Sequence, residues 1–187
     1  MKTLLVSLFM LVFSNSAFAE NGTDSVYTWL DAGMGSYVSS GSNGVLFGGA
    51  LVGYKGKHFL KGRMLYGDEM SDLVDIGTDQ PVENFWSVGM QYGRGVNTKS
   101  VTLYFSAGLG IVSGVKRGAL ISHDGGWFGG NNYERIEYFA PSVPVDVTIS
   151  FKPFRKFGMG FSIVSDFNGK NSYTGFVLAI SMGQQNP

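Results

Sequence analysis

Residues 100–118 have the sequence SVTLYFSAGLGIVSGVKRG, in which apolar residues alternate with small or polar residues. Successive side chains of a β-strand point to opposite faces, so this strand would have one apolar face and one small, polar face. The alternation covers about eleven residues, the length that a tilted strand needs to cross a bilayer. The stretch therefore predicts one strand of a transmembrane β-barrel. Its apolar positions are Val101, Leu103, Phe105, Ala107, Leu109 and Ile111, and the positions between them are Thr102, Tyr104, Ser106, Gly108 and Gly110.

Residues 1–19 have the features of a secretory signal peptide. Lys2 supplies a positive charge, residues 4–13 form an apolar run, and Ala17-Phe18-Ala19 fits a cleavage site. The run is shorter than the roughly 20 apolar residues of a transmembrane helix. We therefore expect cleavage before Glu20 and one exported domain over residues 20–187.

The composition narrows the class of this domain. The chain has 28 Gly, 15 Phe and 9 Tyr, and 15% of its residues are charged, against roughly 25% in soluble proteins. A net charge of zero disfavours nucleic acid as a partner, and the absence of Cys excludes disulfides and a lipid anchor on a cleaved Cys. Two classes remain, a periplasmic or secreted β-protein and an outer-membrane barrel.

The pattern predicts eight strands, joined alternately by longer loops and short turns. Even strand numbers, short periplasmic turns and long outer loops are typical of bacterial outer-membrane barrels, so we expect a closed antiparallel up-and-down barrel. Pro141 and Pro144 cannot donate to a ladder, so we expect a bulge near Pro144 or a regular strand that begins at Val145. The longest loops are predicted at 68–83 and 116–135. The predicted strands are residues 26–38, 44–54, 59–67, 85–92, 100–118, 136–152, 157–167 and 173–183.

The two faces of these strands differ in chemistry. The apolar face should contact lipid, and the other face should fill a lumen that is just wide enough for side chains. Unpaired buried charges are costly, so we expect the inward charges to form an ion and hydrogen-bond network that plugs the lumen. These charges are Asp31, Lys61, Arg63, Asp146 and Asp166. Aromatic residues near strand ends should form an interfacial girdle, with Tyr104 as an inward exception: Trp29, Tyr37, Tyr54, Tyr66, Trp86, Tyr92, Tyr138 and Tyr173.

The eight alternating strands resemble the small OmpA/OmpX-type outer-membrane barrels over all of residues 20–187. The resemblance implies location in the bacterial outer membrane, with outer-membrane lipids, lipopolysaccharide and the barrel assembly machinery as partners. We expect a monomer without cofactor or metal. Such barrels commonly end in an aromatic residue that the assembly machinery recognises, whereas this chain ends Met182-Gly183-Gln184-Gln185-Asn186-Pro187. The assembly signal is then internal, around residues 176–182, or of a different type.

Few residues suggest catalysis or metal binding. His58 is predicted at a periplasmic turn as a solvated side chain. Ser122 and His123 adjoin each other in the loop 116–135, but a catalytic triad is defined by geometry and not by adjacency. Eight-stranded lipid A deacylases carry a His-x-Ser-Asn strand motif, which His123-Asp124-Gly125-Gly126 does not match. The loop 68–83 carries six carboxylates without calcium-loop spacing, so a solvated acidic loop is favoured over a cation site: Asp68, Glu69, Asp72, Asp75, Asp79 and Glu83.

These observations favour a non-enzymatic outer-membrane barrel with a structural or surface-interaction role through its two long outer loops. Two alternatives remain open, a lipid A-modifying hydrolase that uses His123 with Ser122, and a narrow channel along the inward charges. A soluble ligand-carrying barrel is the alternative at the level of the fold. Basic residues gather at the three predicted periplasmic turns, where turn solubility accounts for them: Lys55, Lys57, Arg94, Lys99, Lys152, Arg155 and Lys156.

Overall fold

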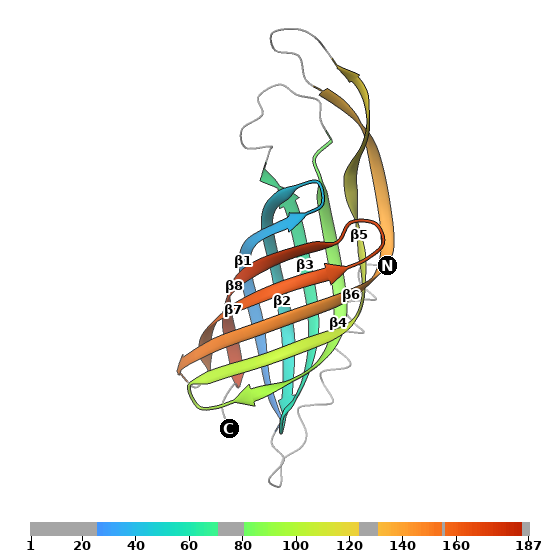
Figure 1. Ribbon diagram of the computed structural model, residues 1–187. Coiled ribbons are helices and arrows are strands. Elements are labelled where there is room, and N and C mark those ends of the chain that lie inside the picture. Colours follow the sequence, from blue (N-terminus) through green and yellow to red (C-terminus); the bar gives the residue numbers. More distant parts are fainter. Residues whose placement is uncertain (1–25, 71–80, 124–130, 155, 185–187) are drawn as a thin grey trace, which may run out of the picture.

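The computed structural model describes residues 26–70, 81–123, 131–154 and 156–184. Eight antiparallel strands close into one barrel, in which each strand pairs with its neighbours in sequence and β1 pairs with β8 (Figure 1). The predicted fold class is therefore confirmed, whereas the predicted signal peptide lies outside the described residues. Within these residues, no helix has the length and apolar character needed to cross a membrane. The strands are β1 (Tyr27–Ser39), β2 (Asn43–Lys55), β3 (His58–Glu69), β4 (Asn84–Asn97), β5 (Val101–His123), β6 (Asn131–Phe154), β7 (Phe157–Phe167) and β8 (Tyr173–Gln184).

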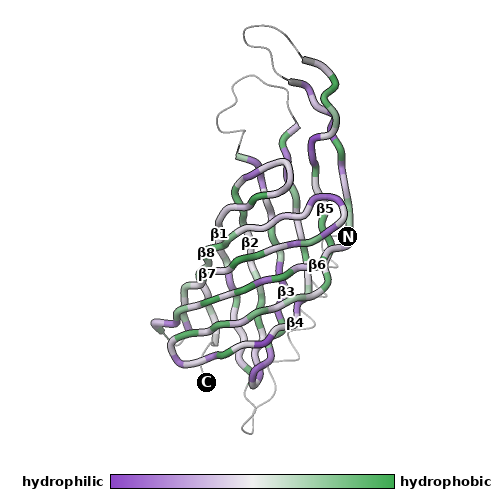
Figure 2. Tube along the Cα trace, in the orientation of Figure 1, coloured by the Kyte–Doolittle hydropathy of each residue, from purple (hydrophilic) through white to green (hydrophobic). Residues whose placement is uncertain are grey.

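The alternation along the strands separates the side chains into an apolar outer wall and a polar and aromatic lumen, and Figure 2 shows the apolar positions recurring along the strands. On β5, Leu109 is 77% exposed, whereas Thr102 and Ser106 are buried. A water-soluble barrel would place its polar face outside, so this distribution is that of a barrel whose outer wall contacts lipid. The outer wall includes Leu30, Met34, Phe47, Leu60, Met64, Met90, Leu103, Phe105, Val147, Phe161, Leu178 and Ile180.

The predicted aromatic girdle is largely wrong. Of its members, Tyr66, Trp86 and Tyr92 are exposed on the outer wall. The other five point into the lumen together with Tyr104, because each occupies an inward position of its strand; Trp29, for example, lies two residues before Asp31 on the same face of β1. The five buried residues are Trp29, Tyr37, Tyr54, Tyr138 and Tyr173.

Three strands, β4, β5 and β6, extend several residues beyond their predicted ends. β4 runs to Asn97, so the turn predicted at 93–99 shortens to residues 98–100. β5 and β6 remain paired to His123 and Asn131, so most of the loop predicted at 116–135 is strand. β5 pairs with β4 only as far as Val115, and β6 pairs with β7 only from Val143. The outer ends of β5 and β6 therefore rise beyond the rest of the barrel as a hairpin (Figure 1).

The two prolines of β6 do not produce the expected bulge. The pairs with β5 run to Ala107–Val145 and resume at Gly110–Ser142 in the same register, so no residue is inserted beside Pro144. β6 is a continuous strand through both prolines. Pro144 is buried, and its ring lies over Gly89, where a Cβ atom would come within 2.9 Å of the Pro144 Cγ.

Gly35 allows β1 to approach β8 closely, and replacing it with Ala should destabilise the barrel. A Cβ atom on Gly35 would lie 1.7 Å from the carbonyl oxygen of Phe176 and 2.7 Å from its carbonyl carbon. Because a backbone must move, Gly35→Ala should cost about 1–3 kcal/mol, measured by urea unfolding of the refolded barrel. Gly53→Ala is the control, since the nearest atom outside its chain neighbours would lie 3.9 Å from the new Cβ. Equal stability of the two variants would contradict the predicted contact.

Candidate functional site

Charged side chains from β3, β6 and β7 meet in the middle of the lumen. Lys61 Nζ lies 2.7 Å from Asp146 Oδ2, and Arg63 donates hydrogen bonds to Asp146 and, over 2.9 Å, to Asp166 Oδ2. These four side chains are at most 4% exposed. β7 lies four strands from β3 in the ring of eight, so Arg63 reaches across the lumen to its far wall. The structure thus brings together four of the five charges singled out in the sequence.

Asp31, the fifth charge, faces the same space but belongs to none of the ion pairs among the described residues. It lines a small cavity together with Lys61, Arg63 and Ser162, and its Oδ1 has no hydrogen-bond partner within the described part of the chain. The central layer therefore contains three carboxylates and two cations. We call Asp31, Lys61, Arg63, Asp146 and Asp166 the lumen charge layer.

Neutral polar side chains surround the lumen charge layer. Ser87 donates a hydrogen bond to Asp166, and Ser106 donates to Gln91 Oε1 over 3.1 Å. Thr148 and Ser162 are joined at 2.9 Å between their hydroxyl oxygens. A buried polar group without partners is destabilising, and these hydrogen bonds avoid that cost for the side chains that they join.

Layers of aromatic side chains lie in the lumen on both sides of the lumen charge layer. Toward the short turns, Phe59 stacks on Tyr104 with ring centroids 4.4 Å apart, and Trp29 packs edge-on against Phe59. Toward the long loops, Phe85 stacks on Tyr173 at 4.2 Å, and Tyr37 packs edge-on against Phe85 at 4.9 Å. A polar path along the barrel axis would have to pass both layers. The sequence predicted Tyr104 to point inward, but the layers as a whole were not predicted, because Trp29, Tyr37 and Tyr173 were expected in the outer girdle.

A second ion cluster lies at the outer rim. Arg117 Nη2 lies 2.7 Å from Glu69 Oε2, and the backbone N–H of Arg117 donates to Glu83 Oε1 over 2.9 Å. The backbone N–H of Glu83 in turn donates to Glu69 Oε2. Arg117 lies just past the last residue of β5 that pairs with β4, so its backbone N–H has no acceptor on that strand. The Glu83 carboxylate takes the place of that acceptor. The sequence predicted that these two carboxylates belong to a solvated acidic loop. The cluster shows that this prediction is wrong for both of them.

Of the other four acidic residues of that predicted loop, Asp68 lies on β3 and accepts a hydrogen bond from the Tyr66 hydroxyl. Asp72, Asp75 and Asp79 lie outside the described residues. Within the described ranges, no group of three or more His, Asp or Glu side chains is placed to hold a metal ion.

The histidines lie far apart along the barrel. His58 begins β3 at a short turn, and its Nδ1 is hydrogen-bonded to the hydroxyl of Tyr92 on β4. His123 is the last residue of β5, and Ser122 pairs with Asn132 near the tip of the hairpin. Ser122 and His123 thus lie beyond the rim, whereas the His-x-Ser-Asn motif of the lipid A deacylases lies on a strand facing lipid.

No family model matches the sequence, and no curated protein matches it. The structure is similar to Ail, the attachment invasion locus protein of Yersinia pestis, solved with the heparin analogue sucrose octasulfate, with a TM-score of 0.53 and 12% identity over 86% of this chain and 97% of Ail. It is similar to Neisserial surface protein A, with a TM-score of 0.53 and 14% identity over 88% and 99% of the two chains.

A third similar structure is the N-terminal β-barrel domain of OprF from Pseudomonas aeruginosa, with a TM-score of 0.53 and 13% identity over 86% of this chain and 99% of that domain. At such identities the similarity concerns the fold. With its eight antiparallel strands closed in a ring, the chain has the fold of the small eight-stranded outer-membrane β-barrels.

Proposed function

We propose that the protein resides in the bacterial outer membrane and acts at the cell surface through the outer ends of β5 and β6, residues 116–123 and 131–142, here called the outer hairpin. The apolar outer wall and the similarity to outer-membrane barrels support the location. The proposal includes removal of residues 1–19 as a signal peptide and exposure of the long-loop end to the outside.

The observation that carries the proposal is that the outer hairpin continues after both of its lateral neighbours have ended. Strand edges without neighbours offer backbone groups to another chain, and exposed apolar side chains favour association with a partner. Leu120 and Ile121 of the outer hairpin are 52% and 65% exposed. Glu83 occupies the β5 edge at Arg117, so the edge of β6 is the more open of the two.

The charge of the outer end favours a protein partner over a sulfated polysaccharide. Ail was solved with a heparin analogue, which a basic surface suits. Here the described part of the outer end has five carboxylates against four basic side chains. The carboxylates are Asp68, Glu69, Glu83, Glu134 and Glu137, and the basic residues are Lys116, Arg117, Arg135 and Lys170. The two aromatic layers and the lumen charge layer support a lumen that does not conduct solutes.

Shortening the outer hairpin should abolish surface binding without unfolding the barrel. Arg117 and Arg135 pair across the hairpin, so replacing residues 118–134 with Asn-Gly gives a two-residue turn between them. Cells that display the parent should adhere to epithelial layers and protein-coated surfaces more than cells with the shortened chain. Leu120→Ser with Ile121→Ser keeps the hairpin and tests its apolar side chains. Equal adhesion of parent and shortened cells, with both barrels folded, would refute the proposed role.

A topology control accompanies this experiment and uses the absence of Cys from the chain. A single Ile121→Cys substitution should react with a large, membrane-impermeant maleimide on intact cells. Lys57→Cys, in the turn between β2 and β3, should react only after the outer membrane is permeabilised. Reaction of Lys57→Cys on intact cells would contradict the proposed orientation.

A further inference from the structure

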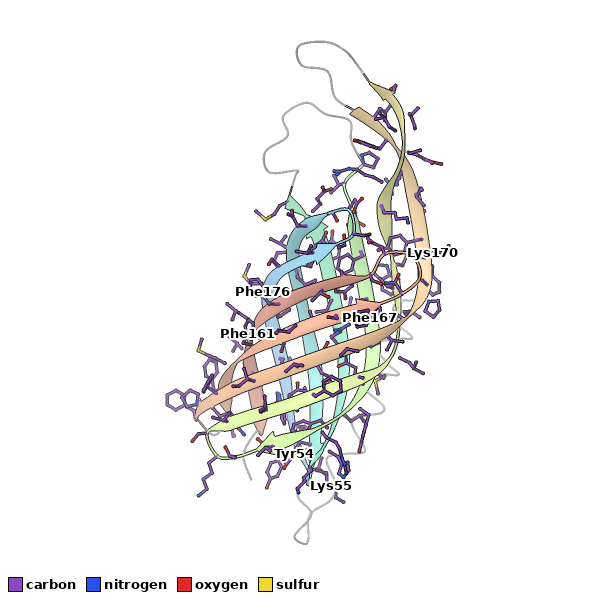
Figure 3. All side chains as sticks on the ribbon, viewed as in Figure 1. Tyr54, Lys55, Phe161, Phe167, Lys170 and Phe176 are labelled. Atoms are coloured by element: carbon purple, nitrogen blue, oxygen red, sulfur yellow. The ribbon has the colours of Figure 1, made fainter. Side chains whose placement is uncertain are left out.

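We propose that the short-turn end of the barrel binds the phosphate groups of anionic phospholipids through Lys57, His58 and Arg94, here called the basic turn site. The inference rests on the proposed function, because it requires the barrel to span a bilayer. Its occupant would be an anionic phospholipid of the periplasmic leaflet, such as phosphatidylglycerol. In Figure 3, Tyr54 and Lys55 mark this end, opposite the outer hairpin.

Backbone pairing holds the three residues of the basic turn site together. The turn between β2 and β3 contains Lys57, and β3 begins at His58, which pairs with Arg94 of β4. The backbone N–H of Gly95 donates to the carbonyl oxygen of Lys57 over 3.2 Å, so the turn is tied to β4. Tyr92, two residues before Arg94 on the same face, is hydrogen-bonded to His58 Nδ1. The Lys57, His58 and Arg94 side chains are exposed, so their nitrogen atoms are accessible to a ligand.

The position of Arg94 on the outer wall indicates a lipid rather than a soluble anion. Its neighbours on that face of β4, Tyr92 and Val96, are 55% and 60% exposed, and its partner on β5 is Phe105, which is 53% exposed. Arg94 therefore stands at the edge of the apolar belt, where a long side chain can lie along hydrocarbon and place its guanidinium among headgroups. A guanidinium matches phosphate oxygens with two parallel hydrogen bonds.

The surrounding charge supports an anionic ligand. None of the three short turns contains an Asp or Glu in its sequence, and Lys99 and Lys156 on the other two turns are exposed. Each basic residue close to an anionic membrane surface strengthens the binding of the protein to that surface about fivefold. The ends of the barrel thus differ: the short turns are uniformly basic, whereas the described outer rim carries mixed charge.

The test compares lipid adducts on the full chain by native mass spectrometry. The chain is refolded into vesicles of equal parts phosphatidylglycerol and phosphatidylcholine and extracted in mild detergent. The parent should retain phosphatidylglycerol preferentially, and Lys57→Gln with Arg94→Gln should lower the ratio of the two adducts by about fivefold for each residue. Arg94→Lys keeps the charge and should retain most of the preference.

One control variant tests the location of the site, and two outcomes separate the site from the proposed function. Lys116→Gln with Lys170→Gln removes two charges at the other end and should leave the ratio unchanged. A double Lys57 and Arg94 variant that folds and keeps the parent's ratio refutes the basic turn site alone. A parent chain that fails to insert into the vesicles, seen as the absence of a heat-modifiable band on gels, refutes both the proposed membrane location and the site.

Discussion

Replacing Arg63 with Met should destabilise the barrel by about 3–5 kcal/mol, because it leaves buried carboxylates without their cation. Arg63 is the single side chain of the described lumen that bridges Asp146 and Asp166, and all three side chains are at most 1% exposed. Met fills much of the space of the Arg stem, so the loss of charge dominates over the loss of packing. Lys61 would still pair with Asp146, whereas Asp166 would keep the hydrogen bonds from the Ser87 and Tyr173 hydroxyls and, among the described residues, no ion pair. Urea unfolding of the refolded barrel, followed by the gel shift of the folded form, measures the change.

Two further variants make the Arg63 result specific. Arg135→Met breaks the pair of Arg135 with Glu137, whose side chains are 63% and 75% exposed, and should change stability by only about 0–1 kcal/mol. Adding Asp166→Asn to Arg63→Met removes one stranded charge and should recover part of the lost stability, as expected for groups in one network. An Arg63→Met barrel as stable as the parent would mean that the lumen charge layer does not hold the barrel together.

Strand parity accounts for what could be predicted from the sequence. A period of two decides which side chains share a face, so strand number, closure and the inward direction of residues such as Lys61 and Asp146 follow from the alternation. Parity also places Trp29 on the same inner face as Asp31, whereas the general preference of Trp and Tyr for membrane interfaces favours the girdle. In a lumen this narrow, buried aromatic rings fill space that small residues leave.

Contacts between distant strands could not be predicted from a local pattern. Asp146 and Asp166 meet Arg63 because the stagger of eight strands sets which inward residues share a level, and no single segment encodes that stagger. Asp31 has the same parity but belongs to none of the ion pairs formed within the described part of the chain. The contacts of Arg117 with Glu69 and Glu83 could not be predicted for the same reason, since they join residues that are far apart in sequence.

The outer hairpin could not be predicted from the sequence, because its residues do not alternate regularly. Its β5 half has the sequence KRGALISH, which has no period of two, and the register shifts between Arg117 and Leu120 and again between Leu120 and Ser122. The strand persists there because β6 supplies a partner. β4 likewise continues through Gly93 and Gly95, which lie in the stretch predicted as a turn. These glycines allow close packing, since a Cβ on Gly95 would lie 2.1 Å from the Leu103 carbonyl oxygen.

Placing Lys at Leu109 should destabilise the barrel in a bilayer by about 2–4 kcal/mol, because the ammonium group would stand near the midplane. The structure identifies this depth: Leu109 pairs with Met90, which lies midway along β4 between the exposed aromatics Trp86 and Tyr92. Phe105, which is also exposed on β5, pairs with Arg94 and so lies nearer the short turns. Unfolding by urea in phosphatidylcholine vesicles measures the cost.

Leu120→Lys is the matched control, because it introduces the same charge on the same strand at a position that is also exposed. Leu120 lies in the outer hairpin beyond the rim, so its replacement should leave stability within about 0.5 kcal/mol of the parent. Solvent exposure alone would predict the smaller effect at Leu109, which is 77% exposed against 52% for Leu120. Only contact with lipid reverses that order, so equal stability of the two variants would mean that the apolar outer wall does not face a membrane.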